Sequence, residues 1–223
     1  QTTESQGKVY GFSLIYSGNF LAQLELDNYD RLRVQLGINP FQFQWQLGSG
    51  EEFVSPEAVM VFSSHGLTEM SQTFHSLFRR HLIRSPWKDL PRPVLLNSWE
   101  ATYFDFDEKK ILDIARTSKE LGVDLFVLDD GWFGNRNSDK GSLGNWTVSR
   151  EKLPNGLASL AKKIKEMGLQ FGLWFEPEMV SDDTPLYQAH PDWVIGHPKK
   201  NISQGRNQYV LDFSNPNVIE AIY

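Results

Sequence analysis

Between residues 94 and 175 the chain repeats one pattern, in which a short apolar stretch is followed by an amphipathic segment that closes at a glycine. The apolar stretches are VLLNSW at 94–99, VDLFVL at 123–128 and QFGLWF at 170–175. Strands that are apolar at successive positions are typical of a parallel sheet with helices on its faces. The pattern therefore predicts the order strand, helix, strand, helix, strand.

The expected helices have recognisable ends. Asp107 can cap the first helix and Gly122 supplies a left-handed stop after it, while Gly168 ends the second helix, at 157–167. A last helix is expected from Pro216, because proline fits a first helical position. The inward positions of the first helix are expected to be Ile111, Ile114, Ser118 and Leu121.

Polar and aromatic side chains follow each expected strand. They are Asn97, Trp99 and Glu100 after the first, Asp129, Asp130 and Trp132 after the second, and Trp174, Glu176 and Glu178 after the third. In parallel α/β folds the ligand site lies at the carboxyl ends of the strands. We therefore expect one shared site. The alternative is structural: adjacent carboxylates can be helix caps or solvated loop charges, and tryptophans in strands are often core residues.

The first connection argues for one kind of parallel fold. The segment NSWEATYFDFD contains neither GxGxxG nor a Walker pattern, which disfavours a doubly wound nucleotide-binding fold. We expect a (β/α)8 TIM barrel instead. Such a barrel takes about 250 residues, whereas residues 91–223 number 133, so only part of a barrel is expected.

The first 66 residues follow a different period. Apolar residues alternate with polar ones at 20–26 and 32–36 on either side of the turn DNYD, which predicts an antiparallel hairpin. FQFQWQLG at 41–48 alternates again and predicts a further strand, wet on one face. Helical spacing replaces alternation at 67–83. We therefore expect an α/β plus β chain with antiparallel β-sandwich strands at 1–66, a linker helix and connection at 67–90, and a partial barrel at 91–223.

The charge and composition of the chain limit the classes of partner and cofactor that it is expected to bind. With 22 basic and 28 acidic residues the net charge is −6, which disfavours nucleic acid and anionic membranes. No apolar run approaches the ~18 residues of a membrane span. The chain has no cysteine, and its five histidines lack the spacing of zinc ligands. We expect a soluble, cytoplasmic protein without a metal or cofactor.

Carbohydrate is the ligand that the strand-end residues suit best. The C–H face of a sugar stacks on aromatic rings, and its hydroxyls donate charge-assisted hydrogen bonds to carboxylates. Glycoside hydrolysis commonly uses two carboxylates, one protonated and one ionised. Asp129, Asp130, Trp99 and Trp174 therefore predict a sugar site in a hydrolase.

Longer motifs carry a family resemblance. They are NSWEATYFDF, LFVLDDGWFG, LGNWTVSREKLPNGL, GLWFEPEMV, HPDWVIGHP and GRNQYVLDFSNP, preceded by SQGKVYGFSLIYSGNF and INPFQFQWQLGSGEEFVSPEAVM. In this order they resemble the microbial α-galactosidases of glycoside hydrolase family 36, and the two upstream stretches resemble the end of that family's N-terminal β-supersandwich. The resemblance covers essentially the whole chain.

This resemblance implies a retaining hydrolase that removes terminal α-linked galactose from oligosaccharides such as melibiose and raffinose. It implies that Asp129 and Asp130 hydrogen-bond galactose hydroxyls, including O4 and O6, and that Trp99, Trp174 and Arg206 line the same pocket. These are binding roles, not catalytic ones. The resemblance also implies a homo-oligomer, often a tetramer.

The resemblance places both catalytic residues beyond Tyr223. The family's nucleophile is the aspartate of a Lys-Trp-Asp motif on the strand after the helix that begins at Ser214, and its acid/base is a later aspartate. Residues 1–223 contain no Lys-Trp-Asp. We therefore expect this chain alone to be inactive and the full-length protein to be the hydrolase.

Two other functions remain open. Asp129, Asp130, Glu176 and Glu178 could hold Mg²⁺ in a barrel that acts through an enolate or a phosphate. Loss of activity on chelation would favour this alternative. A non-catalytic galactose-binding module would instead bind the sugar without turning it over.

Overall fold

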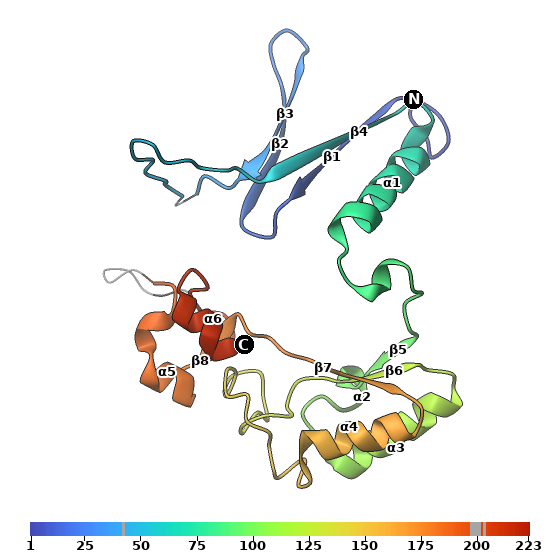
Figure 1. The fold of residues 1–223 in the computed structure, drawn as a ribbon, viewed down its shortest axis with the longest axis vertical. Coiled ribbons are helices and arrows are strands. Elements are labelled where there is room, and N and C mark those ends of the chain that lie inside the picture. Colours follow the sequence, from blue (N-terminus) through green and yellow to red (C-terminus); the bar gives the residue numbers. More distant parts are fainter. Residues whose placement is uncertain (42, 197–201, 203) are drawn as a thin grey trace. The chain divides into compact units, whose positions relative to one another are not determined.

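The computed structural model describes residues 1–41, 43–196, 202 and 204–223 of the chain. They divide into two units, Gln1–Pro91 and Arg92–Tyr223 (Figure 1). Gln42, within the predicted strand at 41–48, and the end of the HPDWVIGHP motif at 197 and 198 lie outside the described residues.

The first unit contains two antiparallel pairs of strands. Strand β1 (Val9–Ile15) pairs with β4 (Glu57–Ser63), and β2 (Phe20–Leu26) pairs with β3 (Leu32–Ile38). The second pair confirms the predicted hairpin. Its turn is held by the Asp27 carboxylate, which accepts hydrogen bonds from the backbone N–H groups of Tyr29 and Arg31.

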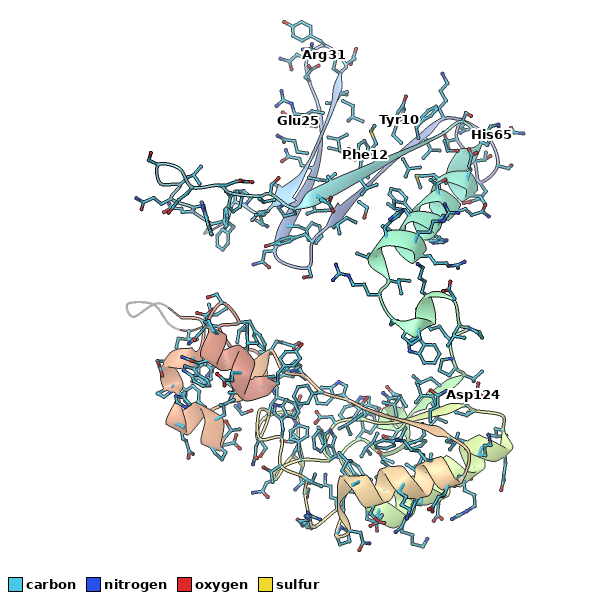
Figure 2. All side chains as sticks on the ribbon, viewed as in Figure 1. Tyr10, Phe12, Glu25, Arg31, His65 and Asp124 are labelled. Atoms are coloured by element: carbon cyan, nitrogen blue, oxygen red, sulfur yellow. The ribbon has the colours of Figure 1, made fainter. Side chains whose placement is uncertain are left out.

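Helix α1 (Gly66–Leu77) follows β4 directly and continues into a π-helical turn (Phe78–Leu82), which confirms the helix predicted at 67–83. It covers one face of the β1–β4 pair at Gly11, where a Cβ atom would lie 2.5 Å from Met70 Sδ and 2.6 Å from Phe74 Cε2. The residues beside Gly11 in β1 point to the opposite face, since side chains alternate along a strand. That face exposes the side chains of Tyr10 and Phe12 (Figure 2).

The strand predicted at 41–48 is wrong for the residues that the structure describes. Residues 43–56 carry no regular secondary structure. Instead, Phe43 and Trp45 pack against Phe53, with ring centroids 6.2 and 4.9 Å apart. Alternating apolar residues can define the face of a strand, but a strand also needs a neighbour to pair with.

The second unit begins with a parallel sheet in the order β5 (Leu95–Asn97), β6 (Leu125–Leu128), β7 (Gln170–Leu173). A short helix, α2 (Trp99–Thr102), follows β5. Helix α3 (Glu108–Glu120) connects β5 to β6, and α4 (Gly156–Glu166) lies between β6 and β7. The predicted order of strands and helices is confirmed.

The helix ends agree with the sequence, whereas one inward position does not. Asp107 Oδ1 accepts a hydrogen bond from Lys110 N at 2.7 Å, and Gly122 has φ of 86°. Leu121, expected to face inward, is 78% exposed, whereas Ala115 is fully buried. Leu121 already lies past the last helical residue, so it has left the buried stripe of α3.

Helices α3 and α4 pack on the sheet through one core. Phe126 and Leu128 of β6 are fully buried together with Ile111 of α3 and Leu160 of α4. Leu125 and Val127, on the other face of β6, are half-buried. The strand was predicted to be buried on both faces, and within the described residues only one face is fully covered.

The last part of the unit has its own small core. Strands β8 (Met179–Ser181) and β9 (Gln208–Val210) pair antiparallel, with α5 (Pro185–Ala189) between them and α6 (Pro216–Ile222) after them. Pro216 occupies the start of α6 as predicted. The buried residues of this core are Val180, Val194, Leu211 and Val218. Among the described residues, no helix has the length and apolarity needed to cross a membrane.

Candidate functional site

The carboxyl ends of β5 and β6 are tied together past the last paired residues. Ser98 N donates to Val127 O at 3.0 Å, which extends the ladder, and Ser98 Oγ accepts from Asp129 N at 3.1 Å. These two bonds place the residues after β5 beside those after β6. The amino ends are joined separately, because Asp124 Oδ2 accepts from Val94 N at 3.0 Å; Asp124 is labelled in Figure 2.

The Asp129 carboxylate is held by two donors and keeps room for others. Its Oδ2 accepts a hydrogen bond from Asn97 Nδ2, and its Oδ1 accepts one from Asp130 N at 2.7 Å. An ionised carboxylate offers about four acceptor positions. Among the described residues, Asn97 and Asp130 donate to this half-buried carboxylate and leave two positions open, which suits it to a pair of hydroxyl donors.

Trp99 lies at the start of α2, beside Asp129 along the same edge. Its backbone N–H donates to Asn97 Oδ1 at 2.7 Å. The indole is half-buried and meets the rings of Tyr103 and Phe104 edge-on, with both centroid distances 5.1 Å. These contacts fix the ring while leaving part of it accessible.

Asp130 differs from Asp129 because an internal cation already engages it. Arg136 donates from Nε to Oδ1 and Oδ2 at 3.0 and 3.2 Å, and from Nη2 to Oδ2 at 2.8 Å. The guanidinium also donates from Nη1 to Gly141 O at 2.6 Å. Most acceptor positions of Asp130 are thus occupied by Arg136, so Asp129 is the more available of the two carboxylates.

Lys152 braces the loop that carries this ion pair. Its Nζ donates to Phe104 O at 2.9 Å and to Arg136 O at 3.0 Å, and it lies 4.7 Å from the centre of the Phe106 ring. Burial lowers the pKa of the ammonium group, and the nearby Asp130 charge opposes that shift. The lysine therefore joins the segment after α2 to the loop after β6.

Trp174 continues β7 and enters an aromatic cluster. Its N–H donates to Leu128 O at 2.9 Å, and its carbonyl accepts from Trp132 Nε1 at 3.0 Å. The indole stacks on Phe133 at 6.4 Å and lies 6.5 Å from the Trp146 ring. Trp174 is half-buried, so part of this ring also remains accessible.

Arg206 reaches the same edge through an ion pair. Its Nη2 lies 2.6 Å from Glu176 Oε1, with side chains 44% and 14% exposed. Burial raises the pKa of Glu176, while attraction by Arg206 works in the opposite direction. Attraction by Arg136 also lowers the pKa of Glu176, and repulsion by Glu178 raises it.

The five predicted binding residues are therefore linked by contacts at the carboxyl end of the sheet. The Asn97 side chain bonds both Trp99 and Asp129, and Asp130 is the next residue after Asp129. The Trp174 backbone bonds Leu128, the last residue of β6, and the Glu176 carboxylate accepts a hydrogen bond from Arg206. Within the described part of the chain, no group of three or more His, Cys, Asp or Glu side chains is placed to hold a metal ion.

Sequence reasoning placed Asn97 among the strand-end side chains of the expected site without giving it a role, and it missed Arg136 and Lys152 as parts of the site. Asn97 was visible as a polar residue at a strand end, but nothing in the sequence set it apart from its neighbours. Arg136 lies in GNRNSDK, a stretch that reads as a solvated loop. Its complete burial arises only when the loop folds back on Asp130.

Comparisons with known proteins agree with one another. Residues 52–223 match the Melibiase family model, and residues 1–48 match the glycosyl hydrolase family 36 N-terminal domain. The chain is 59% identical over 219 residues to α-galactosidase AgaA of Geobacillus stearothermophilus, covering 98% of this chain and 30% of that protein. The chain therefore spans under a third of the length of this relative.

Solved structures give the same result. A variant of AgaA in complex with 1-deoxygalactonojirimycin matches with a TM-score of 0.95 and 58% identity, covering 99% of this chain and 31% of that one. A second variant, in complex with raffinose, matches with a TM-score of 0.94 at the same identity and coverage.

Proposed function

Since this chain belongs to the Melibiase family, the α-galactosidases of glycoside hydrolase family 36, we propose that the full-length protein hydrolyses terminal α-linked galactose. Galactose-containing oligosaccharides such as raffinose and melibiose are the proposed substrates, and the relative crystallised with raffinose supports this class. Hydrolysis proceeds with retention, through two carboxylates about 5–5.5 Å apart.

In this proposal Asp129, Asp130, Trp99, Trp174 and Arg206 bind the galactose and do not perform the chemistry. The observation that carries it is the Asp129 carboxylate, fixed by Asn97 Nδ2 and Asp130 N with two acceptor positions left over. A hexose presents adjacent hydroxyl donors that match such a pair. Trp99, on the same edge, supplies an aromatic surface for the apolar face of the ring.

Asp130 takes the smaller share of ligand hydrogen bonds in this proposal. Arg136 donates hydrogen bonds to both oxygens of Asp130, so the ion pair holds the Asp130 side chain in one position beside the pocket. Arg206 and Glu176 form an opposite-charge pair at the third strand, where the partly exposed guanidinium can donate to sugar oxygens.

The nucleophile and the acid/base are proposed to be aspartates outside residues 1–223, on strands that complete a (β/α)8 barrel begun by β5, β6 and β7. The antiparallel pairs of the first unit are proposed to be the end of a β-supersandwich. The apolar face of β2–β3 supports this proposal: Leu24, Leu26 and Leu32 are 69%, 64% and 62% exposed. A two-stranded hairpin is marginally stable in water unless further strands or a helix cover its apolar face. We also propose a homo-oligomer, which sedimentation velocity can test.

The experiment compares two proteins on p-nitrophenyl α-D-galactopyranoside, namely the full-length protein and purified residues 1–223. The full-length protein should release nitrophenol and the shorter chain should not. Activity of residues 1–223 near the full-length rate would show that the nucleophile is placed wrongly. Full activity after EDTA treatment is also expected, because this mechanism needs no metal, and loss of activity on chelation would favour a metal-dependent barrel enzyme.

A further inference from the structure

We propose that Asn97 is a positioning residue, which fixes the Asp129 carboxylate and the Trp99 indole relative to each other. This inference rests on the proposed function, since it takes both residues as parts of the galactose pocket. Asn97 is the last residue of β5, and its one side-chain amide bonds both Trp99 and Asp129.

The two bonds of Asn97 need both halves of an amide. Its Oδ1 accepts from Trp99 N at 2.7 Å, and its Nδ2 donates to Asp129 Oδ2. Since a backbone N–H can only donate, the oxygen must face Trp99, and the amino group is then left to face Asp129. Aspartate at this position would keep the first bond and lose the second.

The bond to Asp129 sets the plane of its carboxylate. The terminal torsion of an aspartate is broad and roughly two-fold, so a single donor does not fix it well. Asp130 N holds Oδ1 from the following residue, and Asn97 holds Oδ2 from the neighbouring strand. Because the two donors bind different oxygens, they fix the plane of the carboxylate and with it the direction of the remaining acceptor positions.

The bond to Trp99 sets the start of α2. The residue that caps this short helix, Ser98, makes no side-chain hydrogen bond to its first turn. Its hydroxyl instead accepts a hydrogen bond from Asp129 N, just after the end of β6. Asn97 therefore supplies the acceptor that the first helical N–H needs. The helix ends at Thr102, and the ring of the next residue, Tyr103, packs on Trp99.

The test uses two variants of the full-length protein, Asn97→Asp and Asn97→Ala. Binding of 1-deoxygalactonojirimycin is measured by calorimetry, and KM and kcat are measured on p-nitrophenyl α-D-galactopyranoside. At pH 7 both variants should raise Kd and KM by roughly 10- to 100-fold, the range for losing a hydrogen bond to a charged group.

The pH dependence separates positioning from general damage. In Asn97→Asp the introduced carboxylate faces Asp129, and two such groups share a proton as the pH falls. The loss of binding in this variant should therefore shrink between pH 7 and about pH 5, whereas the loss in Asn97→Ala should follow the wild-type pH profile. A merely structural defect would not produce this difference.

Asn155→Asp is the matched control. Asn155 Nδ2 donates to Glu108 Oε2 at 2.9 Å, so the same substitution creates the same facing carboxylates on the helical side of the second unit. It should lower the melting temperature while leaving Kd and KM within twofold of wild type.

The proposal is overturned if both Asn97 variants fold and bind the inhibitor within twofold of wild type, or if Asn97→Asp shows no recovery at lower pH. Should Asn97→Asp fail to fold, the Asn97→Ala result decides alone. A wild-type protein that neither binds the inhibitor nor cleaves the substrate would refute the proposed function instead, so the two failures are distinguishable.

Discussion

Arg136 and Asp130 form an ion pair closed to solvent, with side chains 0% and 6% exposed and 2.8 Å between Nη2 and Oδ2. Transferring two such charges out of water costs several kcal/mol per ion, which good geometry and further hydrogen bonds offset. Arg136 meets this requirement by binding both oxygens of Asp130 and the carbonyl of Gly141. The pair ties the loop after β6 to the predicted sugar pocket.

Arg136→Met should therefore destabilise the full-length protein by about 3–5 kcal/mol, because Asp130 would remain buried without its partner. The measurement is the midpoint of urea unfolding. Arg116→Met is the control, since the pair between Arg116 and Asp113 is 59% and 48% exposed and should matter little. Equal midpoints for the two variants would contradict an important role for the buried pair.

The carboxylate of Glu108 should make stability depend on pH in the acid range. The hydrogen bond from Lys163 holds its pKa below the ordinary 4.5, against the effect of burial, and Asn155 adds a second bond. Because the folded-state pKa is lowered, this stabilisation is complete above pH 4.5 and is lost as the pH falls through the folded value.

Glu108→Gln should therefore cost about 1 kcal/mol at pH 7, a low value for a charged hydrogen bond because Lys163 is partly exposed. The difference from wild type should shrink as the pH falls below 4.5. Urea unfolding of both proteins across this pH range checks the prediction. A gap that stays constant at every pH would rule out the assigned ionic contribution.

Glu176 should act with the opposite sign. Burial raises its pKa above 4.5, so its contribution to stability is complete below that pH and is lost as the pH rises through the folded value. Glu176→Gln removes this loss. From about pH 4 to pH 7, the variant should gain stability relative to wild type, as melting temperatures can show. If wild type gains instead, the ion pair with Arg206 outweighs burial.

Trp99→Ala should weaken galactoside binding without unfolding the protein. The indole provides a surface for the apolar face of the sugar, and loss of an aromatic contact costs about 0.5–1.5 kcal/mol, so KM should rise roughly 2- to 12-fold. Trp193→Ala is the control, because Trp193 stacks on His190 at 3.8 Å in the smaller core. That variant should lose stability with KM unchanged, and the reverse result would refute the assignment.

The order of elements in the second unit could be predicted because its signals are local. Apolar runs mark β5, β6 and β7, and Asp107, Gly122 and Gly168 act through their own backbone neighbourhood. The strand predicted at 41–48 failed because alternation specifies a face and not a partner. The inward position predicted for Leu121 was wrong because α3 ends at Glu120, one residue earlier than the helical spacing of apolar residues indicates.

The sequence by itself determined the family, the strand–helix order and the gathering of acids and indoles at one sheet edge, since parallel strands in register end at the same side. Only the tertiary structure decided how the two adjacent aspartates differ. Asp130 is engaged by an arginine from its own folded loop, while Asp129 is held by an amide from the neighbouring strand and, among the described residues, keeps two acceptor positions open. Hydrogen-bond partners of a carboxylate depend on which groups the fold brings within about 3 Å, and residue order alone does not contain that distance.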